Sequence, residues 1–254
     1  MGNLTKDKFG FSAPVWSPMF PEAPWLMPRT ELLVMFYEAE KEAVLNILPD
    51  ECELLTDPPI VTVILKKAIN GHGGPHYGNY IVPQCKFQGK PYIYDHFLLI
   101  TNDVAMVMGR ELWGDPKKLC YTNWYWEGNE LLVTTERPKE LNILTAHFRI
   151  EKQCGMEDLP CPLYPSIALK YIPSSEENAK PDVHKYIEGP LEFLPLPGGK
   201  LEMWTGTGSI WMPSPTEVLP IYKLAPVKML GAFFIKCGIK VLPGKVIKNF
   251  NEEE

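Results

Sequence analysis

Proline is the residue that most constrains how this chain can fold. The 254-residue sequence holds 26 prolines, about twice the usual frequency of ~5%. Because proline ends helices and interrupts central strands, we expect short elements joined by ordered turns, and a bundle of long helices is disfavoured. Prolines recur at 14, 18, 21, 24 and 28, which predicts an extended, ordered arm over residues 1–30.

Short apolar runs follow one another along the rest of the chain. They are separated by Gly, Pro or Asn, and this spacing is typical of a β-sandwich or a barrel. One amphipathic helix is expected over residues 38–48, where Pro49 ends it, and long loops are expected over 70–79 and 173–182. Strands are expected over residues 32–37, 60–65, 92–100, 104–108, 131–135, 144–150, 166–171, 201–204, 218–222, 229–234 and 239–242.

Charge and hydropathy narrow the range of partners. The net charge is −6 and no basic run is present, which disfavours a nucleic-acid partner. No apolar run approaches the ~18 residues of a membrane span, and the first residues do not have the pattern of a signal peptide. The six cysteines form no Cys-x-x-Cys pair and are expected to be free thiols. We therefore expect a cytoplasmic protein without a membrane partner. The chain is expected to fold as one domain over residues 1–254 and to end in an acidic tail over residues 245–254.

A pair of lysines is the strongest candidate for chemistry. Residues 109–119 read GRELWGDPKKL, so Lys117 and Lys118 directly follow Pro116. Such a pair is usually solvated, since lysine is almost never fully buried. In an apolar pocket beside a second cation, however, desolvation and like charge both oppose the ammonium form. A neutral amine can attack a ketone and form a Schiff base.

Residues 109–119 resemble the signature of the acetoacetate decarboxylase family, in which Gly-Arg-Glu-Leu leads through a short turn to Pro-Lys-Lys. Other segments resemble this family in the expected order, so the resemblance extends over about residues 10–250. These segments are SPMFP at 17–21, PRTE at 28–31, PLYPSIALKYIP at 162–173, EMWTG at 202–206 and LAPV at 224–227. The resemblance implies a mostly β (β-rich α+β) fold, an acetoacetate decarboxylase-like antiparallel β-barrel with a few short helices and an apolar pocket. It also implies a homo-oligomer that acts on a small keto acid and needs no cofactor, whether metal, nucleotide or flavin.

The resemblance assigns roles to particular residues. By position, Lys117 corresponds to the Schiff-base lysine and Lys118 to its electrostatic neighbour. Arg29 corresponds to an arginine near the substrate carboxylate, a role that suits a guanidinium because it stays charged and binds carboxylates bidentately. Glu111, like Arg110, is expected to shape the pocket.

The chain departs from the family pattern at three other positions. Ile64, or Leu65 beside it, and Asn79 stand where the family's decarboxylases carry glutamates. Asp115 stands where the family often has an aromatic residue, and a carboxylate beside Lys117 favours the ammonium form unless it points away or pairs with Lys118. His76 and Asn79 are expected on a loop that covers the pocket.

Three functions follow as hypotheses. The first is a Schiff-base decarboxylase of a β-keto acid, either acetoacetate or a larger analogue, that releases CO2 and a ketone. The second is a Schiff-base aldolase-dehydratase or cyclase on a keto acid, which the departures at Ile64 and Asn79 motivate. The third is a non-catalytic relative that binds a small ligand, against which the retained lysines and Arg29 argue.

Overall fold

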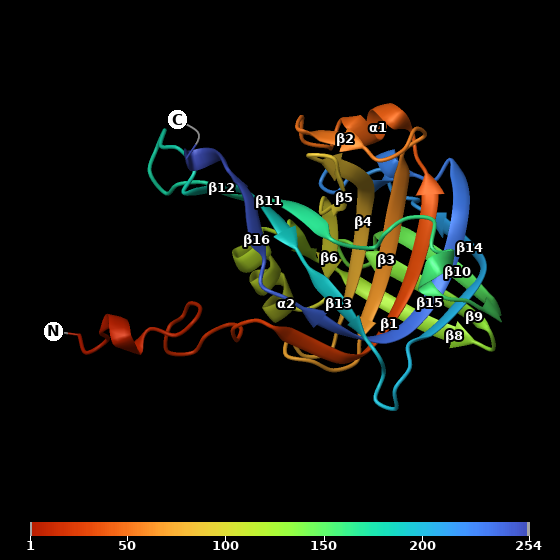
Figure 1. Cartoon of the computed structure of the whole chain (residues 1–254), viewed down its shortest axis with the longest axis horizontal. Helices are drawn as coiled ribbons and strands as arrows, with labels where there is room; N and C mark the ends of the chain where they lie inside the picture. Colours follow the sequence, from red (N-terminus) through yellow and green to blue (C-terminus); the bar gives the residue numbers. More distant parts are fainter. Residues whose placement is uncertain (1, 253–254) are drawn as a thin grey trace.

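The protein is built around one large mixed β-sheet. The structure, a computed structural model, describes residues 2–252. About 49% of the chain is strand and 12% helix, which confirms the mostly β prediction. Along the main path of the sheet the strand order is β16-β12-β11-β5-β4-β3-β1-β15-β14-β10-β9-β8 (Figure 1). Neighbouring strands are antiparallel except for two parallel pairs, β11 with β5 and β6 with β7.

The strands that the structure describes are β1 (Trp25–Glu38), β2 (Cys52–Leu54), β3 (Ile60–Ala68), β4 (His76–Phe87), β5 (Lys90–Tyr94), β6 (Phe97–Ile100), β7 (Lys117–Leu119), β8 (Tyr121–Glu127), β9 (Glu130–Glu136), β10 (Asn142–Gln153), β11 (Ser166–Ile172), β12 (Val183–Gly189), β13 (Leu191–Leu194), β14 (Glu202–Trp211), β15 (Lys228–Val241) and β16 (Lys245–Asn249). The helical segments are η1 (Lys6–Lys8), α1 (Lys41–Leu45), α2 (Asp103–Met108), η2 (Gly109–Trp113), η3 (Met156–Asp158), η4 (Ile221–Leu224) and η5 (Phe250–Glu252).

Strand β1 lies between two hydrophobic cores. It pairs with β15 on one side and β3 on the other, and β1, β3 and β4 lie side by side in Figure 1. Residues 32–37 are all buried, because alternate side chains enter opposite faces of the sheet. Leu33, Met35 and Tyr37 enter one core, whereas the even-numbered residues 32, 34 and 36 enter the other. The second core continues into the cavity described below.

Several expected elements differ from the structure. The expected strand over 92–100 is two strands, β5 and β6, and the expected strands over 229–234 and 239–242 are the single strand β15. Residues 104–108 form helix α2 rather than a strand, because Asn102 caps the helix by accepting a hydrogen bond of 2.9 Å from the amide of Ala105. The expected helix over 38–48 is reduced to the five residues of α1, since the strand β1 continues as far as Glu38. The expected strand over 218–222 is a turn that leads into η4.

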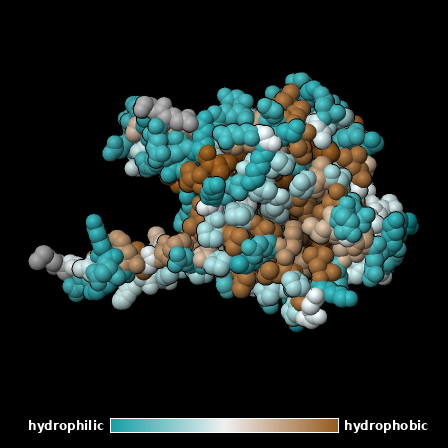
Figure 2. Space-filling view, viewed as in Figure 1, coloured by the Kyte–Doolittle hydropathy of each residue, from teal (hydrophilic) through white to brown (hydrophobic). Residues whose placement is uncertain are grey.

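The N-terminal residues extend away from the sheet, whereas the C-terminal residues form its last strand. Residues 2–19 are mostly exposed and extend away from the sheet as the arm at the left of Figure 1. In the expected acidic tail, residues 245–249 instead form β16, which pairs with β12, and residues 253–254 lie outside the described part. On the face in Figure 2, hydrophobic patches are interspersed with hydrophilic residues. Within residues 2–252, no helix has the length and hydropathy needed to traverse a bilayer.

Candidate active site

The lysine signature folds as a helix, a tight turn and a short strand. Helix α2 runs directly into the π-helical turn η2, and Gly114 follows in the left-handed conformation with φ of 81°. A side chain at Gly114 would overlap the backbone of Lys170 on β11, so glycine meets both a conformational and a steric requirement here. The amide of Asp115 then donates to the carbonyl of Gly109 at 3.1 Å, which folds the start of β7 back against the start of η2.

Lys117 points into a cavity in the second core. Its side chain is 8% exposed, and its Nζ lies 2.7 Å from the Oδ2 atom of Asp115. A methyl group at Gly109 would lie 2.7 Å from Cδ of Lys117 and 2.8 Å from Oδ2 of Asp115. The first glycine of the signature therefore leaves the space that the lysine and its carboxylate partner occupy.

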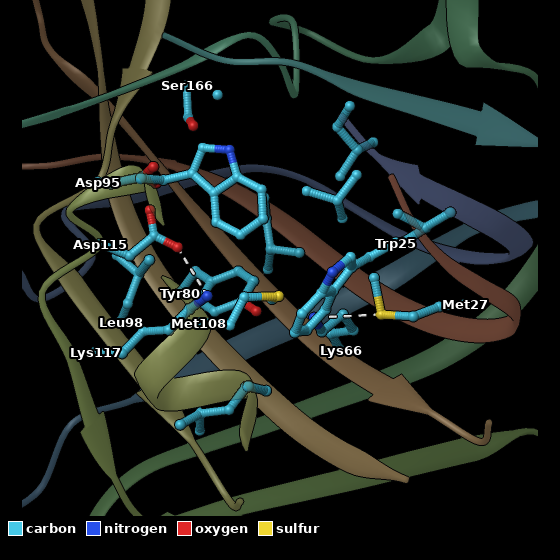
Figure 3. Close-up of a pocket in the computed structure, with 18 of the residues that line it drawn as sticks. Trp25, Met27, Lys66, Tyr80, Asp95, Leu98, Met108, Asp115, Lys117 and Ser166 are labelled. Atoms are coloured by element: carbon cyan, nitrogen blue, oxygen red, sulfur yellow. Dashed lines mark hydrogen bonds and ion pairs between the residues drawn. The ribbon is translucent and has the colours of Figure 1, made fainter. Parts of the chain in front are cut away.

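The cavity is mostly apolar, with a few polar groups that converge (Figure 3). Strands β1, β3, β5, β6, β13 and β15 contribute apolar side chains to its wall, and so do α2 and η2. Such a lining favours a small ligand that places polar atoms at a few defined points. The polar side chains that line it are Lys66, His72, His76, Tyr80, Asp95, Asp115, Lys117, Tyr164 and Ser166.

Lys66 is the second lysine in the cavity, and the sequence analysis did not identify it. Its side chain donates a long hydrogen bond of 3.9 Å to Sδ of Met27, and its Nζ lies 5.4 Å from the ring centroid of Tyr80. Burial, followed by the charge of Lys117, lowers the pKa of Lys66 to about 7, and the charge of Asp115 opposes this shift. Strand alternation could have revealed it, because Lys66 follows Ile64 by two residues and must share its face.

Asp95 and Asp115 have different electrostatic surroundings. Burial, followed by the negative charge of Asp115, raises the pKa of Asp95 well above its usual value, against the hydrogen bond from Ser166 and the charge of Lys117. Burial therefore favours the neutral acid form of Asp95, whereas Asp115 forms an ion pair with Lys117. Figure 3 shows both carboxyl groups on the side of Lys117, and Trp25 and Met27 on the side of Lys66.

Three further groups of the cavity, His76, Tyr80 and Tyr164, remain neutral at neutral pH. Burial, followed by the charge of Lys66, lowers the pKa of His76 to about 3, and the Nδ1 atom of His76 lies 2.9 Å from the carbonyl oxygen of Gly74. Burial raises the pKa of Tyr80 and Tyr164 above the ordinary phenol value. At neutral pH these groups can donate or accept hydrogen bonds without adding charge. Among residues 2–252, no three His, Cys, Asp or Glu side chains gather in a way that could hold a metal ion.

The structure brings four of the expected site residues to the cavity. Ile64, His76, Asp115 and Lys117 line it. His76 and Asn79 do not lie on a covering loop as expected, because β4 already begins at His76. Asn79 points to the opposite face of β4, where its Nδ2 donates to Oγ1 of Thr122 at 2.7 Å.

Lys118 is not the neighbour of Lys117 inside the cavity. Successive residues of a strand point to opposite faces, and Nζ of Lys118 donates to the carbonyl of Val218 at 3.1 Å. Burial lowers the pKa of Lys118, and the charges of Arg137 and Arg110 lower it further. The second lysine of the cavity is therefore Lys66 and not Lys118.

Arg29 and Glu111 also lie outside the cavity lining. Arg29 is exposed beside the irregularity that shifts the β1–β15 register between Met27 and Thr30. This shift places two consecutive exposed residues, Pro28 and Arg29, between two buried ones. Glu111 is exposed on η2, where its backbone carbonyl accepts a hydrogen bond from the side chain of Lys170.

Comparisons with known proteins identify the family of this chain. A family model described as acetoacetate decarboxylase (ADC) matches residues 11–249. The chain is 25% identical to Decarboxylase DEC1 of Cochliobolus heterostrophus over 242 residues, which cover 92% of both chains. It is 24% identical to the acetoacetate decarboxylase of Acidiphilium cryptum over 252 residues, which cover 98% of this chain and 99% of that protein.

Solved structures share the fold. A structure from a study of acetoacetate decarboxylase has a TM-score of 0.84 at 23% identity, covering 97% of this chain and 99% of that one. The enduracididine biosynthesis enzyme MppR, complexed with pyruvate, has a TM-score of 0.71 at 16% identity, covering 96% and 99%. These likenesses show the architecture alone. Because the family model spans nearly the whole chain, the chain belongs to the acetoacetate decarboxylase family and is a lyase of that family.

Proposed function

We propose that this protein decarboxylates a β-keto acid through a Schiff base on Lys117. The observation that carries the proposal is the position of the Lys117 amine, buried in an apolar cavity, in contact with one carboxylate and near a second buried lysine. A lysine amine placed in this way can reach a ketone bound in the cavity, and it attacks the carbonyl carbon in its neutral form. The named decarboxylases among the relatives support the same reaction class.

Asp115 is placed to move the proton of the nucleophile. It forms an ion pair with Lys117 at rest, and the short separation of 2.7 Å allows it to accept the ammonium proton as the ketone enters. The free amine then attacks the carbonyl carbon. Loss of water gives an iminium, whose positive nitrogen accepts the electron pair that the breaking C–C bond releases.

Asp95 is placed to supply a proton. Burial raises its pKa and so favours the acid form, and a neutral carboxylic acid in an apolar site is a proton donor. After CO2 departs, the enamine carbon takes up one proton, and one water molecule hydrolyses the new iminium. The products are CO2, the ketone and the ammonium form of Lys117, which restores the ion pair with Asp115. Asp95 regains its proton from solvent, so the reaction consumes one proton for each CO2 released.

Trapping of the imine tests this function. The protein is incubated with acetoacetate, pyruvate or a longer β-keto acid, reduced with borohydride, and digested for peptide mapping by mass spectrometry, while CO2 release is measured in parallel. We expect an adduct on Lys117 that has lost the carboxylate, and CO2 release that is abolished in Lys117→Met. The matched control is Lys118→Met, which changes the next residue of the same strand and should retain the adduct.

Two results would contradict the proposal. An adduct on Lys117 that keeps its carboxylate, without CO2 release, would indicate aldolase-type chemistry instead. An unmodified Lys117 with every ketone, while a known Schiff-base enzyme is trapped in parallel, would exclude the imine and favour a binding protein.

A further inference from the structure

Lys66 is a buried cation without an anionic partner. Within residues 2–252 its side chain forms no ion pair and no hydrogen bond to an oxygen atom, and its nearest polar contact is Sδ of Met27. A thioether is a weak acceptor, and an ammonium group carries three donors. A buried charge is costly unless it is paired and hydrogen-bonded, so this position favours an anion that enters the cavity.

Sheet register places Lys66 and Lys117 on the same wall. Across neighbouring strands, Lys117 pairs with Leu98, which pairs with Tyr80, which pairs with Ile64. Lys66 lies two residues beyond Ile64 on β3 and therefore leaves the same face of the sheet. Both side chains line one cavity, and their charges interact, since Lys117 lowers the pKa of Lys66.

The charges of the cavity show where an anion is missing. The charges of Lys117 and Asp115 offset each other in their ion pair. Burial favours the neutral form of Asp95, and His76 is neutral because burial lowers its pKa to about 3. Among the described lining residues, this leaves the ammonium form of Lys66 uncompensated. A monoanionic ligand would therefore balance the charge of the site.

We propose that Lys66 is the carboxylate-binding residue of this enzyme, so that the substrate is a keto acid whose carbonyl meets Lys117 while its carboxylate pairs with Lys66. This inference rests on the proposed function of Lys117. It assigns to Lys66 the role that the sequence suggested for Arg29, which is exposed and does not line the cavity. Lys66 then determines specificity, because a neutral ketone leaves its charge without a partner.

The experiment compares one acid with its neutral counterpart. Acetoacetate and methyl acetoacetate share the reacting ketone and differ in the negative charge. For each probe, the concentration that gives half-maximal borohydride trapping on Lys117 is measured with the wild type, Lys66→Met and Lys66→Arg. Lys67→Met is the matched control, because Lys67 points to the other face of β3 and pairs with Glu31 at 3.8 Å.

We expect Lys66→Met to raise the half-maximal concentration of acetoacetate about tenfold or more, as for loss of one partner from a buried charge pair. The value for methyl acetoacetate should stay within about twofold, since no charge pair is lost. Lys66→Arg should recover part of the preference for the acid, and Lys67→Met should resemble the wild type with both probes.

Three outcomes would overturn the proposal. An equal loss for both probes in Lys66→Met would mean that Lys66 acts through the reactivity of Lys117. Unchanged values for both probes would mean that another group binds the carboxylate. An adduct on Lys66 itself in the wild type would make it a nucleophile rather than a binding residue.

A second measurement separates this proposal from the proposed function. Lys117→Met cannot form the imine, so calorimetric titration of this variant with acetoacetate reports binding alone. Binding that disappears in the Lys66→Met, Lys117→Met double variant supports the carboxylate site even if no imine is ever trapped in the wild type. Binding that is the same in both variants contradicts the role of Lys66, whatever chemistry Lys117 performs.

Discussion

The burial of Lys66 predicts a specific dependence of stability on pH. Its pKa is about 7 in the folded protein and 10.5 for an ordinary lysine. Between these values the unfolded chain binds more protons than the native protein, so the free energy of unfolding rises with pH. Below pH 7 both states carry the proton, and the destabilisation caused by the buried ammonium is fully present.

The size of the effect follows from the two pKa values. From pH 7 to pH 9 the native protein loses about half a proton from Lys66 while the unfolded chain keeps its proton. Integrated at ~1.4 kcal/mol per pH unit, this stabilises the native state by about 2 kcal/mol. Lys66→Met lacks this contribution, so its advantage in stability over the wild type should shrink by about 2 kcal/mol across this range.

Few other groups near Lys66 titrate in this interval. His76 is already neutral, and Tyr80 remains protonated because burial raises its pKa. The remaining neighbours, Lys117 and Asp115, form a charge-balanced pair. The difference between the wild type and Lys66→Met therefore reports mainly on Lys66.

Urea unfolding at pH 7, 8 and 9, at one protein concentration, measures this difference. With a slope of about 2 kcal/mol/M, the gap between the two midpoints should change by about 1 M. Lys67→Met, which points away from the cavity, should show a constant difference from the wild type. A gap for Lys66→Met that does not change between pH 7 and pH 9 would refute the reasoning, because Lys66 would then titrate alike in the folded and unfolded states.

Three further substitutions test the geometry around the cavity. Gly109→Ala places a methyl group against the Lys117 side chain, so we expect borohydride trapping to fall by about tenfold or more. We also expect overpacking to lower the unfolding free energy by ~1–3 kcal/mol. Unchanged trapping would contradict this packing. Gly114→Ala forces a left-handed residue against the backbone of Lys170 and should lower the unfolding free energy by about 2 kcal/mol or more, measured by urea unfolding at pH 7. Arg29→Ala removes an exposed side chain outside the cavity, so the half-maximal concentration of acetoacetate for borohydride trapping should stay within about twofold of the wild-type value. A larger increase would mean that Arg29 takes part in substrate binding.

The sequence predicts those parts of the site that depend on local order. The signature predicts Lys117 because its turn is encoded within eleven consecutive residues, with glycines where the turn requires them. The continuous apolar run at 32–37 likewise predicts a strand, since a strand between two cores is buried on both faces. Helix α2 is missed because its apolar residues fit a strand equally well, and Asn102 decides the outcome through one hydrogen bond.

What the sequence does not predict is how distant segments supply charge to one cavity. The positions where glutamates were expected hold Ile64, which is apolar, and Asn79, which faces away. The carboxyl groups reach the cavity instead from the bend after β5, as Asp95, and from the turn before β7, as Asp115. An alignment that compares one position at a time would record a loss of acids, although the cavity retains two.

The sequence also does not show directly which lysines enter the cavity, but strand alternation can predict them. Lys66-Lys67 and Lys117-Lys118 are both Lys-Lys pairs on strands, and in each the first residue is buried in the cavity while the second points away. From composition alone, both Lys-Lys pairs would be predicted to be exposed to solvent. Once one residue of a strand is assigned to a pocket, however, the pleat assigns every second residue to the same side. Applied to Ile64, this rule identifies Lys66 as a cavity residue, and applied to Lys117 it excludes Lys118. Once one residue of each strand is known to face the cavity, strand alternation therefore predicts which lysine of each pair lines it.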